Sequence, residues 1–179
     1  DQPGYYVREA TGANPTYLGP TGGNLDQQYK ALLDRYMFSP DGRYRLFVGS
    51  TGANQTAIFI EPPSEERAAG ATSQQLTNLN GLSWDPAWSP DGGRIVFVSN
   101  TTGSDDIWIV NADGSGLRNL TIGMQSWDKR PSWSPDGTRI VFWSDRSGLM
   151  QLHVMDADGQ NVRNISQTTW DETDPLWVR

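Results

Sequence analysis

The chain has 179 residues, and its 14 Lys and Arg against 21 Asp and Glu give a net charge of −7. An acidic chain without a basic cluster is a poor match for nucleic acid and for an anionic membrane surface. No apolar run reaches the length needed to insert into a membrane, and the absence of Cys rules out disulfide staples. A start at Asp1 rather than Met is typical of a processed or trimmed N-terminus.

Two segments near the start of the chain stand apart from the pattern of the rest. Leu25, Tyr29, Leu32 and Tyr36 recur at the spacing of one helix face, which predicts a short helix over residues 24–36. Residues 61–75 are mostly charged, small or polar, and they predict a long polar connection between two strands.

The main pattern is a repeat built on the tetrapeptide Ser-Pro-Asp-Gly. It occurs at 39–42, 89–92 and 134–137, so successive copies lie 50 and then 45 residues apart. Pro suits the second position of a tight turn, Asp bonds nearby backbone, and Gly takes the fourth position. Two short apolar runs follow each turn, as at 95–98 and 107–110. Repeats of this length with several short strands indicate one supersecondary unit stacked on its neighbours.

These apolar runs do not alternate with polar residues, so both faces of each predicted sheet are buried. Sheets sandwiched between other sheets are the blades of a propeller. We therefore predict an all-β fold, a β-propeller whose blades are four-stranded antiparallel sheets. Eight Trp residues are expected to fill much of the space between blades. The residues that mark the repeat, and to which we assign structural roles, are Asp41, Asp91, Asp136, Trp88, Trp133 and Trp177.

The two ends of the chain fit the same repeat. Shifted forward by 40 residues, 11–14 falls on 51–54 and Asp1 falls on Asp41. Shifted back by 44 residues, 177–179 falls on 133–135. This phase predicts four blades in a ring that is closed by pairing of the N- and C-terminal strands. The alternative is a fragment of a larger propeller. The predicted blades are 175–179 with 1–35, 36–80, 84–125 and 129–170.

The consensus W-S-P-D-G-x-R-I-V-F-x-S, then G-x-x-x-I-x-x-x-(N/D)-A-D-G, then L-T or I-S, resembles the WD40-like, TolB-type (PD40) β-propeller repeat. The resemblance is strong over 36–179 and weak over 1–35. It implies an exported protein, in the periplasm, the cell envelope or outside the cell. The family includes periplasmic scaffolds, surface proteins and propeller domains of prolyl peptidases, so the resemblance specifies the fold better than the function.

Catalytic signals are weak. The one histidine, His153, lies in a predicted strand at a place where other repeats have apolar or aromatic residues, so we interpret it as a packed side chain. The nucleophile pattern G-x-S-x-G fails at Asp85, and no phosphate loop or His/Cys metal spacing occurs. We predict that the chain is not an enzyme and needs no cofactor. Calcium is the one ion that its turns could bind.

Two turns are candidate calcium sites, and three short motifs are candidate glycosylation sites. Asp113, Asp156 and Asp158 lie in oxygen-rich turns that calcium could use, but the full ligand loop is missing and a tight turn is the favoured interpretation. Glycosylation motifs begin at Asn54, Asn119 and Asn164. The last two coincide with the repeat's own strand consensus, which favours a structural role.

The best candidate for a binding surface is the end of the propeller that carries the loops between strands two and three and between successive blades. A Trp-Asp pair recurs there, and further charged residues join it. The candidate residues are Trp84, Asp85, Trp127, Asp128, Trp170, Asp171, Asp105, Asp106, Asp145 and Arg146. Such a face could bind a sugar ring, a peptide or a cation, while the competing interpretation is that Trp wedges between blades and Asp caps the loops.

The sequence thus predicts a non-catalytic scaffold that binds a protein or peptide partner. Three alternatives remain open: a structural subunit that assembles with itself by exchange of terminal strands, a carbohydrate-binding module that uses the Trp-Asp loops, and a propeller fragment of a larger peptidase-associated protein. A glycan panel read by Trp fluorescence separates the sugar-binding alternative from the others.

Overall fold

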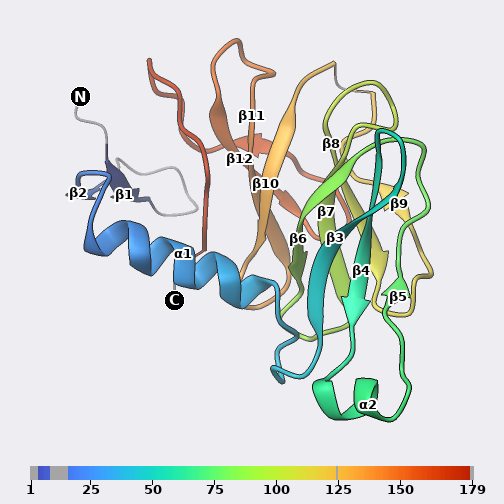
Figure 1. Ribbon diagram of the computed structural model, residues 1–179. Coiled ribbons are helices and arrows are strands. Elements are labelled where there is room, and N and C mark those ends of the chain that lie inside the picture. The colour runs from blue at the N-terminus through green and yellow to red at the C-terminus, as the bar shows by residue number, and fades with distance from the viewer. Residues whose placement is uncertain (1–3, 9–15, 124, 178–179) are drawn as a thin grey trace.

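The computed structural model describes residues 4–8, 16–123 and 125–177. In these residues the strands form four antiparallel sheets (Figure 1). A small sheet pairs β1 (Tyr5–Val7) with β2 (Thr16–Gly19). The other three sheets are blades in the order β3-β4-β5, β6-β7-β8-β9 and β10-β11-β12-β13. Their bounds are β3 Arg45–Gly52, β4 Gln55–Glu61, β5 Gln74–Gln75, β6 Ser83–Trp88, β7 Arg94–Ser99, β8 Asp106–Asn111, β9 Arg118–Asn119, β10 Asp128–Trp133, β11 Arg139–Ser144, β12 Gln151–Asp156 and β13 Arg163–Asn164.

Each Ser-Pro-Asp-Gly turn is held by the same hydrogen bonds. In the third copy Ser134 Oγ donates to Asp136 Oδ1 at 2.6 Å and accepts from the Arg139 N–H at 2.9 Å. Asp136 Oδ1 also accepts from the Thr138 N–H at 3.1 Å. These bonds favour the ionised carboxylate, and they lower the pKa of Asp136 to about 2. The same bonds form at the other two turns, where the pKa values of Asp41 and Asp91 are also lowered.

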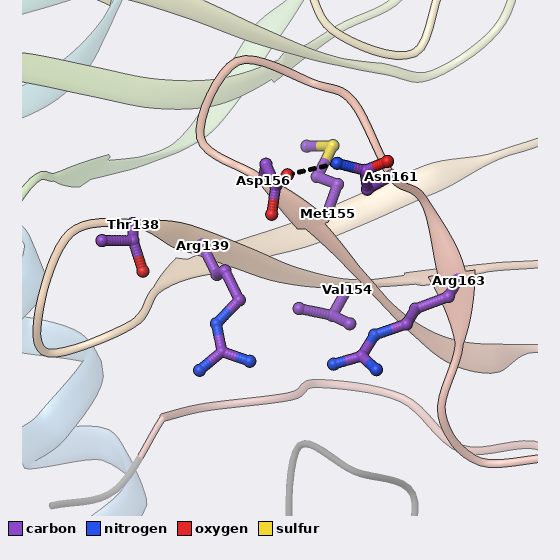
Figure 2. Close-up of a pocket in the computed structure, with 7 residues that line it drawn as sticks. All are labelled: Thr138, Arg139, Val154, Met155, Asp156, Asn161 and Arg163. Carbon is purple, nitrogen blue, oxygen red and sulfur yellow. Dashed lines mark hydrogen bonds between the residues drawn. The ribbon is translucent and has the colours of Figure 1, made fainter.

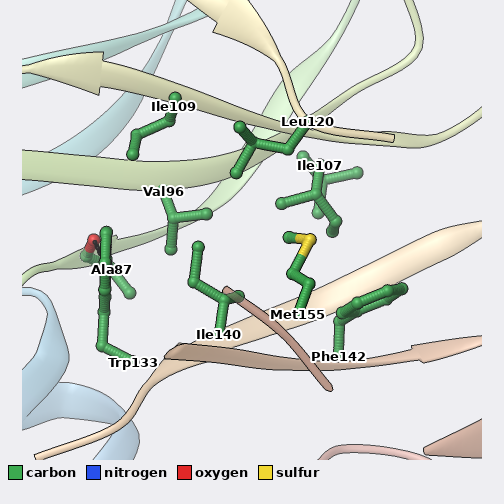
Figure 3. Close-up of a cluster of buried hydrophobic side chains, with 10 residues drawn as sticks. Ala87, Val96, Ile107, Ile109, Leu120, Trp133, Ile140, Phe142 and Met155 are labelled. Atoms are coloured by element: carbon green, nitrogen blue, oxygen red, sulfur yellow. Dashed lines mark hydrogen bonds between the residues drawn. The ribbon is translucent and has the colours of Figure 1, made fainter. Parts of the chain in front are cut away.

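The core lies between blades, as expected from strands that are apolar on both faces. Ile95, Val96, Phe97 and Val98 of β7 are all fully buried, with alternate side chains packing on the two neighbouring blades. Trp133 is 1% exposed and its Nε1 donates to the Ala87 carbonyl of the preceding blade at 3.2 Å. Figure 3 shows the interface between the β6–β9 blade and the β10–β13 blade, where side chains of both blades interdigitate.

The predicted helix is confirmed as α1 (Asn24–Tyr36), and its predicted apolar face is half-buried. Tyr29 and Tyr36 on that face donate their hydroxyls to the Asp174 and Trp177 carbonyls, at 3.0 and 3.4 Å. The helix therefore lies along the C-terminal segment and also contacts the inner strand β6 (Figure 1). The polar connection at 61–75 contains a second, short helix, α2 (Ser64–Ala68). Among the described residues, no helix is both long enough and apolar enough to cross a membrane.

The predicted closure of a four-bladed ring is not found in the described residues. β1 pairs with β2, and the segment that ends at Trp177 forms no strand there. The two ends instead meet through side chains, because Arg8 Nη2 lies 2.8 Å from Glu172 Oε1. β1 pairs through its backbone with β2 of the same hairpin, while Trp177 packs against the β10–β13 blade. The prediction of closure also used Asp1, 11–14 and 178–179. These residues lie outside the described part of the chain.

Candidate functional site

Two sets of loops meet at one end of the blades, as the sequence predicts. Ser83 at the start of β6 pairs with Ser99 at the end of β7, and Asp128 at the start of β10 pairs with Ser144 at the end of β11. The loops before the inner strands therefore lie beside the hairpins that connect the second and third strands, at the upper end of Figure 1. We call this end the loop face and define it by residues 78–83, 100–105, 120–123, 125–127, 145–150 and 166–173.

The loop face carries large apolar side chains that solvent reaches. Ile122 is 69% exposed and Trp127 is 52% exposed. The other exposed large apolar residues of these loops are Leu82, Leu149 and Trp170. Of these five, sequence analysis selected only the two Trp residues. Exposed apolar side chains gathered at one end of a domain are typical of an interaction surface.

Trp127 is contacted by charged side chains at both its backbone and its ring. Its backbone N–H donates to Asp145 Oδ1 at 2.8 Å, and its ring centroid lies 5.0 Å from Lys129 Nζ. Lys129 is held in turn by Asp105 Oδ2 at 2.8 Å and by the ring of Trp143, whose centroid lies 5.6 Å away. Lys129 was not among the predicted residues, although its position one residue after a Trp-Asp pair could have drawn attention to it. The cluster presents a large aromatic surface whose orientation is set before any partner arrives.

Two predicted acidic residues are structural. Asp128 is fully buried, and its Oδ1 accepts from Arg146 Nη2 at 2.8 Å. Asp106 is also buried, where it accepts hydrogen bonds from the Thr102 hydroxyl, from Ser104 Oγ at 3.1 Å and from Asn119 Nδ2 at 2.7 Å. Both carboxylates hold the loops together from inside, so neither can meet a partner directly.

The three Trp-Asp pairs occupy different structural positions. Trp84 lies in β6 and packs on the inter-blade core, whereas Trp127 lies in the loop ahead of β10 and Trp170 lies in the C-terminal segment after β13. Asp171 Oδ1 accepts from the Met150 N–H at 2.9 Å, which caps the neighbouring hairpin. The pairs resemble each other in sequence but not in role.

Asp85 belongs to another set of equivalent residues, which precede the Pro of each inner segment. Asp85, Arg130 and Asp174 all have left-handed backbones, with φ of 49°, 54° and 54°. Arg130 Nη1 lies 3.2 Å from Asp85 Oδ1, and its Nε lies 3.0 Å from Asp174 Oδ1. Burial raises the pKa of Asp85, and the positive charge of Arg130 opposes that rise. Sequence analysis missed Arg130, which the shared residue-Pro pattern could have revealed.

His153 is a packed side chain in β12. Its ring stacks on Phe142 at 5.7 Å, and its Nδ1 lies 3.0 Å from the Gln151 carbonyl, so Nδ1 carries the proton of the neutral ring. Burial lowers the pKa of His153 from its usual 6.5, and the Gln151 carbonyl offsets part of that shift.

The unfolded chain therefore binds a proton at His153 more readily than the folded chain. We expect stability to be full above pH 6.5 and to fall as the pH decreases below it, by at most about 1.4 kcal/mol per pH unit for one proton. Melting curves of the wild type and of His153→Phe between pH 8 and 5 test this. The variant is expected to lose the acid sensitivity in that range, and an unchanged sensitivity would contradict the assignment.

The other candidate residues sit in hydrogen-bonded turns. Asp113 Oδ1 accepts from Ser115 N at 2.9 Å, Asp158 Oδ1 accepts from Gln160 N at 2.9 Å, and Asp156 Oδ2 accepts from Asn161 Nδ2 at 2.6 Å. The described part of the chain contains no group of three or more acidic, His or Cys side chains placed to hold an ion. Calcium binding at these turns stays a prediction.

The three glycosylation motifs differ in environment. Asn54 is exposed in the turn between β3 and β4. Asn119 and Asn164 are half-buried, and their Oδ1 atoms accept from the N–H of Thr121 and Ser166, at 2.8 and 2.9 Å. These bonds agree with the structural interpretation of those two motifs.

Comparison with known proteins places the repeat in context. The TolB protein of the Tol-Pal system from Anaeromyxobacter dehalogenans is 46% identical over 92 residues, which are 51% of this chain and 20% of that protein. The putative TolB structure from Agrobacterium tumefaciens matches 72% of this chain and 47% of that one, with 29% identity and a TM-score of 0.61. A puromycin-hydrolysing peptidase from Mycobacterium tuberculosis matches 72% of this chain at 21% identity, with a TM-score of 0.59, and shares the fold alone.

The chain spans between 20% and 36% of the curated relatives that it matches. The family model for the PD40, TolB β-propeller domain matches residues 27–178, which include all three blades. This chain therefore belongs to the PD40 family of TolB-type β-propellers.

Proposed function

We propose that this chain is a non-catalytic propeller module that binds a protein partner through its loop face. The observation that carries the proposal is Trp127, which is half-exposed, while Asp145 holds its backbone and Lys129 lies against its ring. A rigid aromatic side chain loses little conformational entropy on binding, and Trp residues are frequent hot spots of protein interfaces. The one histidine is packed between blades, which is the environment of a structural side chain and not of a surface base.

The partner is proposed to be a protein of a Tol-Pal type assembly, since TolB of that system is among the relatives. An exported location follows from the same likeness and is part of the proposal. A sugar site that uses the Trp-Asp pair at Trp127 is less well supported, because the Asp of that pair does not reach solvent. Asp128, the expected polar neighbour of Trp127, is fully buried against Arg146.

Titration of the purified chain with the Pal protein of Anaeromyxobacter dehalogenans, by calorimetry, tests both parts of the proposal. We expect binding by the wild type and a loss of at least tenfold in affinity for Trp127→Ala. The matched control is Phe38→Ala, because Phe38 is an exposed aromatic residue beside a turn at the opposite end of the blades. No binding by the wild type would reject this partner class, and equal weakening by both variants would reject the loop face.

A further inference from the structure

One side of the β3–β5 blade has no other blade packed on it in the described part of the chain. Leu46, Ile58 and Ile60 of this sheet pack in the core that it shares with the β6–β9 blade. Because side chains alternate along a strand, the residues between them point to the opposite side of the sheet. We call this opposite side the rear face and define it by Phe38, Arg45, Phe47, Gly49, Phe59 and Glu61.

The other two blades bury the matching positions against the blade that precedes them. The residues that match Phe38, Arg45 and Phe47 are Trp88, Ile95 and Phe97 in the β6–β9 blade and Trp133, Ile140 and Phe142 in the β10–β13 blade. On the rear face, in contrast, Phe38 is 43% exposed and the Arg45 side chain is 54% exposed. The β3–β5 blade thus retains aromatic residues at positions that are buried between blades elsewhere in the fold.

Phe47 and Phe59 form an aromatic layer on the rear face. They are paired across β3 and β4, with ring centroids 5.1 Å apart and ring planes 15° apart. Gly49 leaves room for the Phe59 ring, since a Cβ atom at that position would lie 2.7 Å from it. Both rings are half-buried. Aromatic side chains that stay partly in water on one face of a sheet are typical of an interaction surface.

The register of β3 and β4 makes the rear face complementary to itself. Arg45 is paired with Glu61 two residues along the strands from the pair of Phe47 and Phe59. A two-fold axis that runs between β3 and β4 and parallel to them lays β3 of one copy over β4 of a second copy. Arg45 of each copy then lies over Glu61 of the other, and Phe47 over Phe59. Opposite charges and aromatic rings therefore meet, as a two-fold contact of one surface with itself requires.

The contacts within the chain leave Arg45 available for this role. Arg45 Nη1 lies 3.9 Å from Glu61 Oε2, and the Arg45 side chain is more than half exposed. Glu61 Oε1 is contacted by Arg67, so its Oε2 is the oxygen that faces Arg45. An exposed ion pair of this length contributes little to stability. Exchanging it for the same pair between two copies therefore has little cost.

The opposite end of the row of blades differs, because the chain's own C-terminal segment contacts it. Trp177 packs against the β10–β13 blade, and Arg139 lies 5.5 Å from its ring. A pocket of about 470 Å³ lies beside Arg139 and Arg163, and Figure 2 shows their side chains extending to the same side of the sheet. A contact that uses the rear face of both copies leaves this end unchanged.

We propose that two copies of this chain associate through their rear faces, related by a two-fold axis. Sheets that pack face to face lie about 10 Å apart and interdigitate their side chains, so the Phe38, Phe47 and Phe59 rings become buried. Sedimentation velocity over a range of concentrations is expected to show an equilibrium between the 19.8 kDa of one chain and a dimer, without larger species.

Charge reversal tests the contact itself. Arg45→Glu and Glu61→Arg each place like charges across the axis at two symmetric points, so each variant alone is expected to associate at least tenfold more weakly. A mixture of the two variants restores opposite charges at both points and is expected to regain association. An effect confined to the ion pair within one chain would not be reversed by mixing.

Lys30→Glu is the matched control, because Lys30 is exposed on α1 and the change of charge is the same as in Arg45→Glu. It is expected to associate like the wild type, and circular dichroism and melting curves verify that every variant folds. A wild type that stays at the mass of one chain up to several hundred micromolar overturns the proposal. Association that neither charge reversal weakens, that the mixture fails to restore or that continues beyond a dimer also overturns it.

Discussion

Trp133→Ala is expected to lower the free energy of unfolding by about 3–5 kcal/mol, since it removes a fully buried aromatic side chain from the core between two blades. Trp133 is 1% exposed, packs with Ala87, Val96 and Ile140, and donates its indole N–H to the preceding blade. For a chain of this length the loss corresponds to a decrease in melting temperature of roughly 10 °C. Thermal unfolding followed by circular dichroism measures it.

Trp127→Ala is the control for this experiment, because it removes the same side chain from a half-exposed position on the loop face. We expect a change in stability of less than about 1 kcal/mol for this variant. Equal losses for Trp127→Ala and Trp133→Ala would mean that the described packing between blades does not hold the fold together.

Arg146→Met is expected to cost about 3 kcal/mol, because it leaves the buried carboxylate of Asp128 without its counter-charge. The Arg146 side chain is 18% exposed, whereas that of Asp128 is not exposed at all. For this reason the reverse change, Asp128→Asn, is expected to cost less, since Arg146 can turn its guanidinium toward water. Urea unfolding of both variants measures the difference.

Arg130→Met provides the comparison with an exposed ion pair. Arg130 lies within 3.2 Å of Asp85 and 3.0 Å of Asp174, but its side chain is 45% exposed. Exposed pairs contribute about 0–1 kcal/mol, so this variant is expected to unfold close to the wild type. A loss as large as that of Arg146→Met would contradict the contrast between buried and exposed pairs.

Much of the fold could be predicted because its signals are local. The Ser-Pro-Asp-Gly turns, the strands that follow them and the helix at 24–36 all depend on residues close in sequence, and the structure confirms them. Closure of the ring depended on a pairing between distant segments. The phase of the repeat fits that pairing, but β1 pairs with the adjacent β2, a contact that short-range sequence patterns did not reveal.

The sequence predicted only part of the candidate site. Exposure of Trp127 and Trp170 was part of the binding hypothesis, and the structure places both in exposed loops. Trp84 was grouped with them because a Trp-Asp pair looks the same in sequence wherever the strand begins. Trp84 lies four residues before Trp88, as Lys129 does before Trp133, and the same bulge follows both residues. Trp84 and Asp85 are therefore equivalent to Lys129 and Arg130 and not to Trp127 and Asp128, which the shared Trp-Asp pair concealed.

The most direct test of the account is photo-crosslinking in cells that express the chain with a photoreactive amino acid in place of Trp127 or of Thr138. Both positions are exposed, but Trp127 lies on the loop face and Thr138 lies in a turn at the opposite end of the blades. If the loop face binds the partner, an adduct with a distinct partner protein forms from position 127 and not from position 138. The same adduct from position 138 alone, or from both positions equally, would contradict the loop face as the binding surface.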